Sequence, residues 1–232
     1  FTGLFCCGLL PVSVIVRFFM IVISPEEIRK KRSGYSYPTV SIQGKYPNLS
    51  IIKFDSTEKM DVYHQSLLLS ASDDDVVLGY LGVIFWGFYS GKDGNLREER
   101  AFSRLKIAYN GDTRIRKNKE IKITGVIDIG IASVARKIRN ALFSIKNNKI
   151  DEALKKLMEL PQLEVAFASK LCAFLSPEKC GVADSVIASN YPEFNFDVNE
   201  DGNIKNNKHN IANYKTYCLF LQKKADDMNF LG

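Results

Sequence analysis

Residues 160–185 read LPQLEVAFASKLCAFLSPEKCGVADS. The pattern predicts a helix over about 165–175 that packs an apolar face into the core. Pro177 and Gly181 then interrupt it, since neither residue continues a helix well. A further helix is expected to start near Asp184, because aspartate is a preferred residue at a helix N-terminus. The stretch therefore predicts two helices joined by a short irregular segment.

This stretch resembles the helix-hairpin-helix element of the DNA glycosylase superfamily, which includes the 8-oxoguanine, endonuclease III-like and 3-methyladenine glycosylases. In that family a Leu-Pro pair opens the hairpin, an alanine packs the second helix and a catalytic aspartate follows a short loop. Leu160, Pro161 and Ala168 match the first positions, and Asp184 falls at the catalytic aspartate. The resemblance is specific over 126–185. It implies a mainly α-helical, glycosylase-like fold with a few short N-terminal strands, and no cofactor or metal.

Some positions differ from the family pattern, and these differences limit which type of glycosylase reaction the resemblance implies. Gln162 and Glu164 replace two glycines that let the hairpin backbone approach a phosphate, although the resemblance still places Gln162, Leu163 and Ala166 against DNA. Ala166 stands where bifunctional members have a nucleophilic lysine. The resemblance therefore implies a monofunctional enzyme in which water attacks the sugar. Lys170 lies one turn further along the same face, as an alternative nucleophile or a phosphate contact.

The implied reaction explains why an aspartate is wanted at position 184. Cleavage of an N-glycosidic bond develops positive charge on the deoxyribose, which a fixed carboxylate stabilises while it orients the attacking water. Asp184 can equally be an ordinary helix cap, and the two roles are compatible. The flipped base also needs flat or apolar neighbours, for which Trp86 and Tyr89 are candidates. Alternatively, these two aromatic residues belong to the core.

Charge favours a polyanionic partner. The formal net charge is +6 and the pI about 9.0, and residues 97–149 hold fourteen basic against five acidic side chains. Such a surplus attracts nucleic acid or an anionic membrane surface, and it is also compatible with a solvated helix face. Arg136, Lys137 and Arg139 are the candidates for phosphate contacts, on a helix whose apolar face is expected to be buried.

The remaining elements follow from hydrophobic spacing and from turn residues. Residues 35–55 predict loops with one or two short strands, and 76–89 predict a buried helix with acids at its start and Gly91 after its end. Further helices are expected over 96–109, 131–145, 151–160 and about 210–223, and the basic stretch 114–122 is expected to be a connector.

The N-terminal residues and the cysteines bear on localisation. Phe1 to Ser24 is strongly apolar, which fits a membrane anchor, a signal peptide, or upstream sequence before a true start at Met20. We favour the last and divide the chain into residues 1–19, an N-terminal region over 20–125 and a helical hairpin-containing region over 126–232. Five cysteines without disulfide or zinc spacing predict a reducing, cytoplasmic setting.

Three hypotheses follow from these patterns. The first is a monomeric, monofunctional DNA N-glycosylase that flips and excises a damaged or modified base from double-stranded DNA, in repair or in defence against phage DNA. The second is a non-catalytic DNA-binding module of the same fold, which the missing lysine and glycines favour. The third takes the apolar N-terminal residues as an anchor and makes the chain a membrane-tethered helical protein, although we expect no stable membrane partner.

Overall fold

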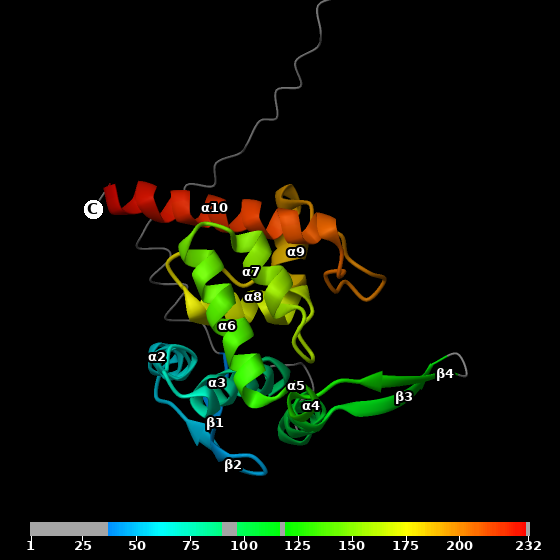
Figure 1. Cartoon of the computed structure of the whole chain (residues 1–232). Coiled ribbons are helices and arrows are strands. Elements are labelled where there is room, and N and C mark those ends of the chain that lie inside the picture. The colour runs from blue at the N-terminus through cyan, green and yellow to red at the C-terminus, as the bar shows by residue number, and fades with distance from the viewer. Residues whose placement is uncertain (1–36, 90–96, 117–118, 231–232) are drawn as a thin grey trace, which may run out of the picture. The chain divides into compact units, whose positions relative to one another are not determined.

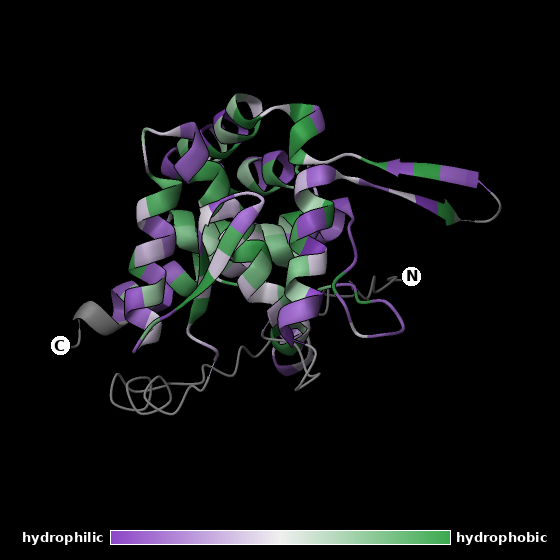
Figure 2. Ribbon diagram, turned by 90° about the horizontal axis from the view of Figure 1, so that it is seen from below, coloured by the Kyte–Doolittle hydropathy of each residue, from purple (hydrophilic) through white to green (hydrophobic). Residues whose placement is uncertain are grey.

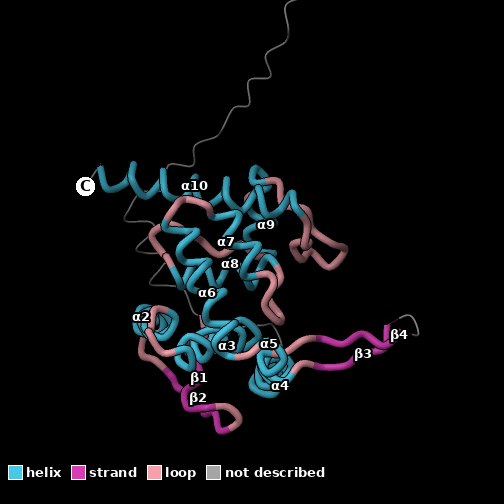
Figure 3. The backbone as a smooth tube through the Cα atoms, in the orientation of Figure 1, coloured by secondary structure: helices cyan, strands magenta, loops and turns pink. Residues whose placement is uncertain are grey.

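The computed structural model describes residues 37–89, 97–116 and 119–230, and these belong to one compact unit (Figure 1). The hypotheses about residues 1–19, Met20 and Gly91 lie outside the described residues. The described part is mainly helical, with two separate pairs of short antiparallel strands, which confirms the predicted fold class at that level (Figure 3).

The first strand pair begins the described chain. β1 (Val40–Lys45) and β2 (Asn48–Lys53) form a hairpin that pairs Ile42 with Ile51. This confirms the short strands predicted over 35–55. Only the start of β1 is buried, so the hairpin covers one edge of the helical core. α2 (Thr57–Leu68), which the sequence analysis did not predict, follows with Ser56 as its N-cap.

α3 (Asp73–Tyr89) is the central helix, and it confirms the predicted buried helix. Its first turn holds three aspartates, where the positive end of the helix dipole favours negative charge. Ten of its side chains or glycines are buried, because β1, α2, α4, α6 and α8 all pack against it. α4 (Arg97–Asn110) follows, close to the predicted range 96–109.

The basic stretch after α4 is a β-ribbon, and the expected connector over 114–122 was wrong. β3 (Asp112–Arg116) and β4 (Lys119–Ile123) pair antiparallel, with Ile115 opposite Glu120. Isoleucines alternate here with charged residues at a period of two, which favours strands over an irregular loop. The connector was predicted from the charges of this stretch, without regard to the alternation of isoleucines with charged residues.

The C-terminal half consists of helices that match the predicted ones closely. α5 (Val126–Ile129) leads into α6 (Ile131–Lys146), and α7 (Ile150–Leu157) and α8 (Val165–Leu175) flank the turn over 158–164. The short elements α9 (Ser185–Asn190) and η2 (Pro192–Phe194) precede the long α10, which extends beyond the predicted end at 223 and has the bounds Lys208–Phe230.

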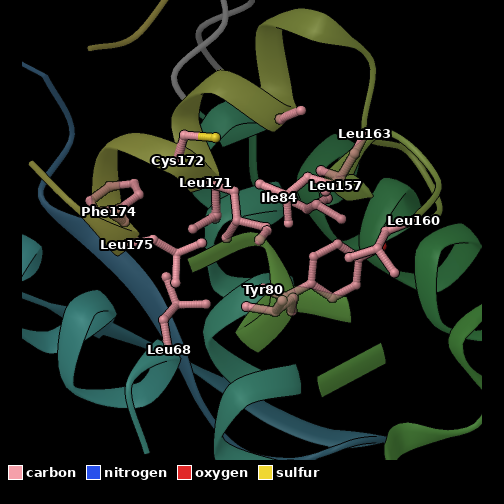
Figure 4. Packing of buried hydrophobic residues seen from close by; sticks show 14 of the residues in the cluster. Leu68, Tyr80, Ile84, Leu157, Leu160, Leu163, Leu171, Cys172, Phe174 and Leu175 are labelled. Atoms are coloured by element: carbon pink, nitrogen blue, oxygen red, sulfur yellow. The ribbon is translucent and has the colours of Figure 1, made fainter. Parts of the chain in front are cut away.

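The core lies mainly between α3, α6, α7 and α8, and it positions the turn between α7 and α8. Figure 4 shows side chains of α3 and α8 interlocking with those of the turn, among them Tyr80, Ile84, Leu160, Leu163 and Leu171. Cys172, Cys180 and Cys218 are buried free thiols. Among the described helices, none has both the length and the apolar character needed to cross a bilayer.

Candidate active site at Lys170 and Asp184

The turn over 158–164 contains one residue in the left-handed backbone region. Gln162 has a φ of 60°, in a region that favours glycine because other side chains crowd the backbone there. Buried Leu160 and Leu163 hold the two sides of the turn, and the Tyr80 hydroxyl of α3 donates a hydrogen bond to the Pro161 carbonyl (2.5 Å). Gln162 itself is half-buried, so the turn presents it at the surface.

The N-terminus of α8 is capped by a residue from a distant loop. The Val165 N–H donates to the Asn206 side-chain oxygen (2.9 Å), while Glu164, the residue before the helix, is exposed. Ala166 is half-buried in the first turn. One backbone donor that the helix start offers to an anion is thus already bonded within the protein.

Lys170 and Asp184 form a largely buried ion pair. The Lys170 Nζ lies 3.6 Å from the Asp184 Oδ2, and the two side chains are 7% and 24% exposed. Burial lowers the pKa of Lys170, because water no longer stabilises the ammonium, and the charge of Asp184 opposes that shift. The amine also lies 5.6 Å from the centre of the Phe167 ring. The structure therefore brings the two predicted catalytic residues together.

Asp184 is held as a helix cap. Its Oδ1 accepts hydrogen bonds from the backbone N–H groups of Val186 (3.0 Å) and Ile187 (3.2 Å) at the start of α9. The preceding residue is fixed on α8, since the Ala183 N–H donates to the Ser169 hydroxyl oxygen (2.9 Å). This leaves Oδ2 directed to Lys170, so one carboxylate is both a cap and an ion-pair partner.

The loop that carries Asp184 is also tied to α10. Two tyrosine hydroxyls of that helix donate to loop carbonyls, Tyr214 to Gly181 (3.0 Å) and Tyr217 to Val182 (3.2 Å). Sequence reasoning missed Ser169 and both tyrosines as residues that position the site. Only Ser169, directly before Lys170, was close enough in sequence to have been found.

A stacked pair of phenylalanines flanks Lys170. Phe167 of α8 stacks on Phe88 of α3 with ring centres 4.5 Å apart, and a Cβ at Gly87 would collide with the Phe167 ring. The guanidinium of Arg104 lies 5.2 Å from the Phe88 ring centre. Sequence reasoning missed Phe167 as a site neighbour. Its signal was the spacing of three residues from Lys170, which places both on one face of the helix.

The proposed base-pocket residues have other neighbours. Trp86 is buried, its indole N–H donates to the Pro38 carbonyl (3.1 Å), and its ring packs edge-on against Phe174. Tyr89 packs beside Phe85 with ring centres 5.5 Å apart. These contacts place Trp86 in the core, which agrees with the alternative interpretation of the aromatic run.

Two of the three predicted phosphate contacts already have partners within the protein. Lys137 pairs with Glu159 at the edge of the turn. Arg139 pairs with Asp73 and donates to the Ala71 carbonyl (2.8 Å), so it ties α6 to the start of α3. Arg136 is exposed on the same helix.

A hollow of about 480 Å³ lies beside the turn. Its walls are Ile123 and Thr124 at the end of the ribbon, Ile129 and Lys137, and Glu159, Leu160 and Pro161 of the turn. A second hollow of about 530 Å³ is formed by the loop 198–205. Asp184 lines neither of these two. Within the described part of the chain, no three His, Cys, Asp or Glu side chains are grouped to hold a metal ion.

Comparison with known proteins assigns the chain to no family, since no family model, no curated protein and no solved structure matches it.

Proposed function

We propose that this protein is a monofunctional DNA N-glycosylase with Asp184 as its essential carboxylate. The observation that carries the proposal is the Lys170–Asp184 ion pair, which lies at the end of the segment that resembles the glycosylase hairpin. A lysine with a lowered pKa beside a rigidly held carboxylate is typical of a functional site, because a purely structural pair brings little net stability.

The reaction uses the carboxylate of Asp184, a side chain that is 24% exposed. As the bond between C1′ and the base nitrogen breaks, its electron pair leaves with the base and positive charge develops on the sugar. The carboxylate stabilises that charge. It also accepts a proton from the water whose oxygen bonds to C1′, and this proton then passes to the departing base or to solvent. Both roles need a carboxylate held in one orientation, which the cap on α9 supplies.

Lys170 acts in this scheme as a positioning residue. Its side chain is less exposed than that of Asp184, so the carboxylate is the more accessible partner. The ammonium fixes Oδ2, while the backbone of α9 fixes Oδ1. A neutral substitute such as Lys170→Met is expected to lower the rate, because Oδ2 loses the partner that orients it.

The test uses 25-base-pair duplexes that each carry one modified base, among them 8-oxoguanine, 3-methyladenine and uracil. Alkaline strand cleavage reports the abasic sites. The wild-type chain is expected to release at least one of these bases, and Asp184→Asn to reduce the rate at least about a hundredfold. Asp151→Asn is the matched control, because Asp151 is also in an ion pair with a lysine, Lys215, on the surface.

Borohydride distinguishes the two possible nucleophiles. A covalent adduct trapped during base release, and lost in Lys170→Met, would show that the amine attacks C1′ and would overturn the water route. Release of base without an adduct supports attack by water. The enzyme proposal fails if no duplex in the panel loses a base.

A non-catalytic DNA-binding module is the second candidate. The position of Asp184 favours it, since this side chain lines neither of the two hollows, whereas an enzyme that excises a base must hold the flipped base beside its carboxylate. It predicts salt-dependent duplex binding that is weaker in Arg136→Ala, with no base release by any variant.

A further inference from the structure

The β3–β4 ribbon projects from the helices that form the core. Figures 1 and 2 show it extending beyond α4 and α5, and its strands pair with each other. At its base, Gly111 has a φ of 78°, and a Cβ at Gly125 would collide with the backbone of Gly111. The two strands therefore leave the body side by side through a tight junction, which sets the direction of the ribbon.

The ribbon is strongly basic. Residues 112–123 contain five basic and two acidic side chains. Two of the cations have acidic neighbours, Arg114 with Asp112 and Lys122 with Asp128, both at 2.9 Å. The Arg114 side chain hydrogen-bonds to Asp112 and lowers its pKa, yet Arg114 stays 46% exposed. The surplus positive charge thus faces solvent, where it can meet an anionic partner.

Isoleucines are exposed on both faces of this basic ribbon. Ile115 is 80% exposed and Ile121 44% exposed. The register pairs Ile115 with Glu120 and Ile121 with Arg114, so the two isoleucines point to opposite faces. Apolar side chains at the exposed tip of a projecting element contribute nothing to the core. They are suited to contacts with a partner that also attracts the cations.

The base of the ribbon adjoins the turn over 158–164. Ile123 and Thr124 share the walls of the 480 Å³ hollow with Leu160 and Pro161. A duplex that contacts the turn over 158–164 must therefore pass the base of the ribbon.

We infer that the β3–β4 ribbon is an arm that lies in the major groove of duplex DNA next to the turn, an inference that rests on the proposed DNA-binding function. The major groove, about 12 Å wide, admits a two-stranded ribbon. Five residues per strand at about 3.3 Å each give a length of about 16 Å, which corresponds to about five base pairs. The cations contact phosphates, and the isoleucines contact base edges such as thymine methyl groups.

Pairing with a second copy of the chain is disfavoured by the same residues. A free strand edge can add a strand from another molecule, but charged side chains along it oppose this. Two ribbons of equal positive charge repel each other, whereas the phosphates of a duplex attract both strands.

The test compares full-length variants on a 25-base-pair duplex with a central tetrahydrofuran abasic analogue, and on the same duplex unmodified. Arg114→Ala/Lys119→Ala removes two ribbon cations, and Ile115→Ser removes one apolar contact. Lys223→Ala/Lys224→Ala, near the far end of α10, is the control of equal charge change. Fluorescence anisotropy at several salt concentrations gives affinity, and hydroxyl-radical footprinting gives the contacted length.

The ribbon double variant is expected to bind about tenfold more weakly near 0.15 M salt, with a salt slope smaller by about two. Its footprint should be shorter by about five base pairs on one side of the analogue. Ile115→Ser should weaken binding without changing the salt slope, and the α10 control should match the wild type. Equal affinity and footprint in the ribbon variant and the α10 control would overturn the inference.

Two further readouts separate this inference from the proposed function. If the wild-type chain releases a base but its footprint does not depend on the ribbon, the inference about the arm is contradicted and the enzyme proposal is supported. If the footprint depends on the ribbon but no base is released, the inference about the arm is supported and the enzyme proposal is contradicted. Ribbon-dependent capture by phosphatidylserine vesicles, with duplex binding unaffected, would replace DNA by a membrane and overturn the inference.

Discussion

Lys170 and the β3–β4 ribbon both carry positive charge, but in opposite surroundings. Lys170 is 7% exposed inside the helical body, whereas Lys122 of the ribbon is 71% exposed. Two unit charges 4 Å apart interact by about 1 kcal/mol in water and by about 4 kcal/mol at an effective dielectric constant of 20. The buried charge therefore depends on its partner within the protein, and the ribbon charges are available to partners outside it.

The largest effect on stability is expected when Asp184 is removed. Asp184→Ala is expected to lower the free energy of unfolding by roughly 3 kcal/mol, because it strands a buried ammonium and deletes a helix cap. Asp151→Ala, which breaks the more exposed pair with Lys215, should cost about 1 kcal/mol or less. Urea denaturation of both variants measures the difference. Equal losses would mean that the buried pair is no more coupled than a surface pair.

A second buried titratable group, His64 of α2, tests the effect of burial in the absence of an ionic partner. Its Nε2 lies 2.8 Å from the Ser41 hydroxyl, and burial lowers its pKa from 6.5 to about 4. Between these values the unfolded chain binds a proton that the folded chain does not, so stability falls as the pH drops from 6.5 to 4. The expected loss is about 3 kcal/mol. Denaturation of the wild type and His64→Gln at pH 7 and pH 4 measures it, and parallel losses in the two chains would contradict the assignment.

A smaller effect on the free energy of unfolding is expected in the turn over 158–164. Gln162→Gly is expected to stabilise the chain by about 0.5–1 kcal/mol, because glycine adopts the left-handed backbone with less strain. Asn148→Gly is the control, since Asn148 has a φ of 58° and asparagine tolerates this region. Thermal denaturation should show a gain for the first variant and little change for the second. Destabilisation by Gln162→Gly would mean that contacts of the glutamine side chain outweigh its backbone strain.

The smallest effect on folding is expected in the ribbon. Arg114→Ala breaks an exposed ion pair and should shift the Tm by no more than about 1 °C, because solvent screens that pair. The same substitution weakens duplex binding under the proposed role of the arm. Differential scanning calorimetry combined with anisotropy separates the two effects. A large fall in Tm would show that the ribbon belongs to the folding core and is not a free arm.

The helices of the C-terminal half could be predicted because their hydrophobic spacing is regular. Val134, Ile138 and Ile145 are buried on one face of α6, as their spacing indicated. The ribbon was missed because the stretch was interpreted from its five basic residues, and the alternation of charged residues with Ile115 and Ile121 was not considered. α2 was missed as well, since a short helix with Asp and Gln among few apolar residues has a weak periodic signal.

The amino-acid sequence alone predicted most of the helices, and it showed that the segment 160–185 holds an amine at Lys170 and a carboxylate at Asp184. Local spacing suffices for this, because a helix places residues three and four apart on one face. The three-dimensional packing was needed to show that Lys170 meets Asp184, that Arg139 binds Asp73, and that Trp86 is part of the core. These contacts join residues far apart in the chain, and their energies depend on the burial that packing creates.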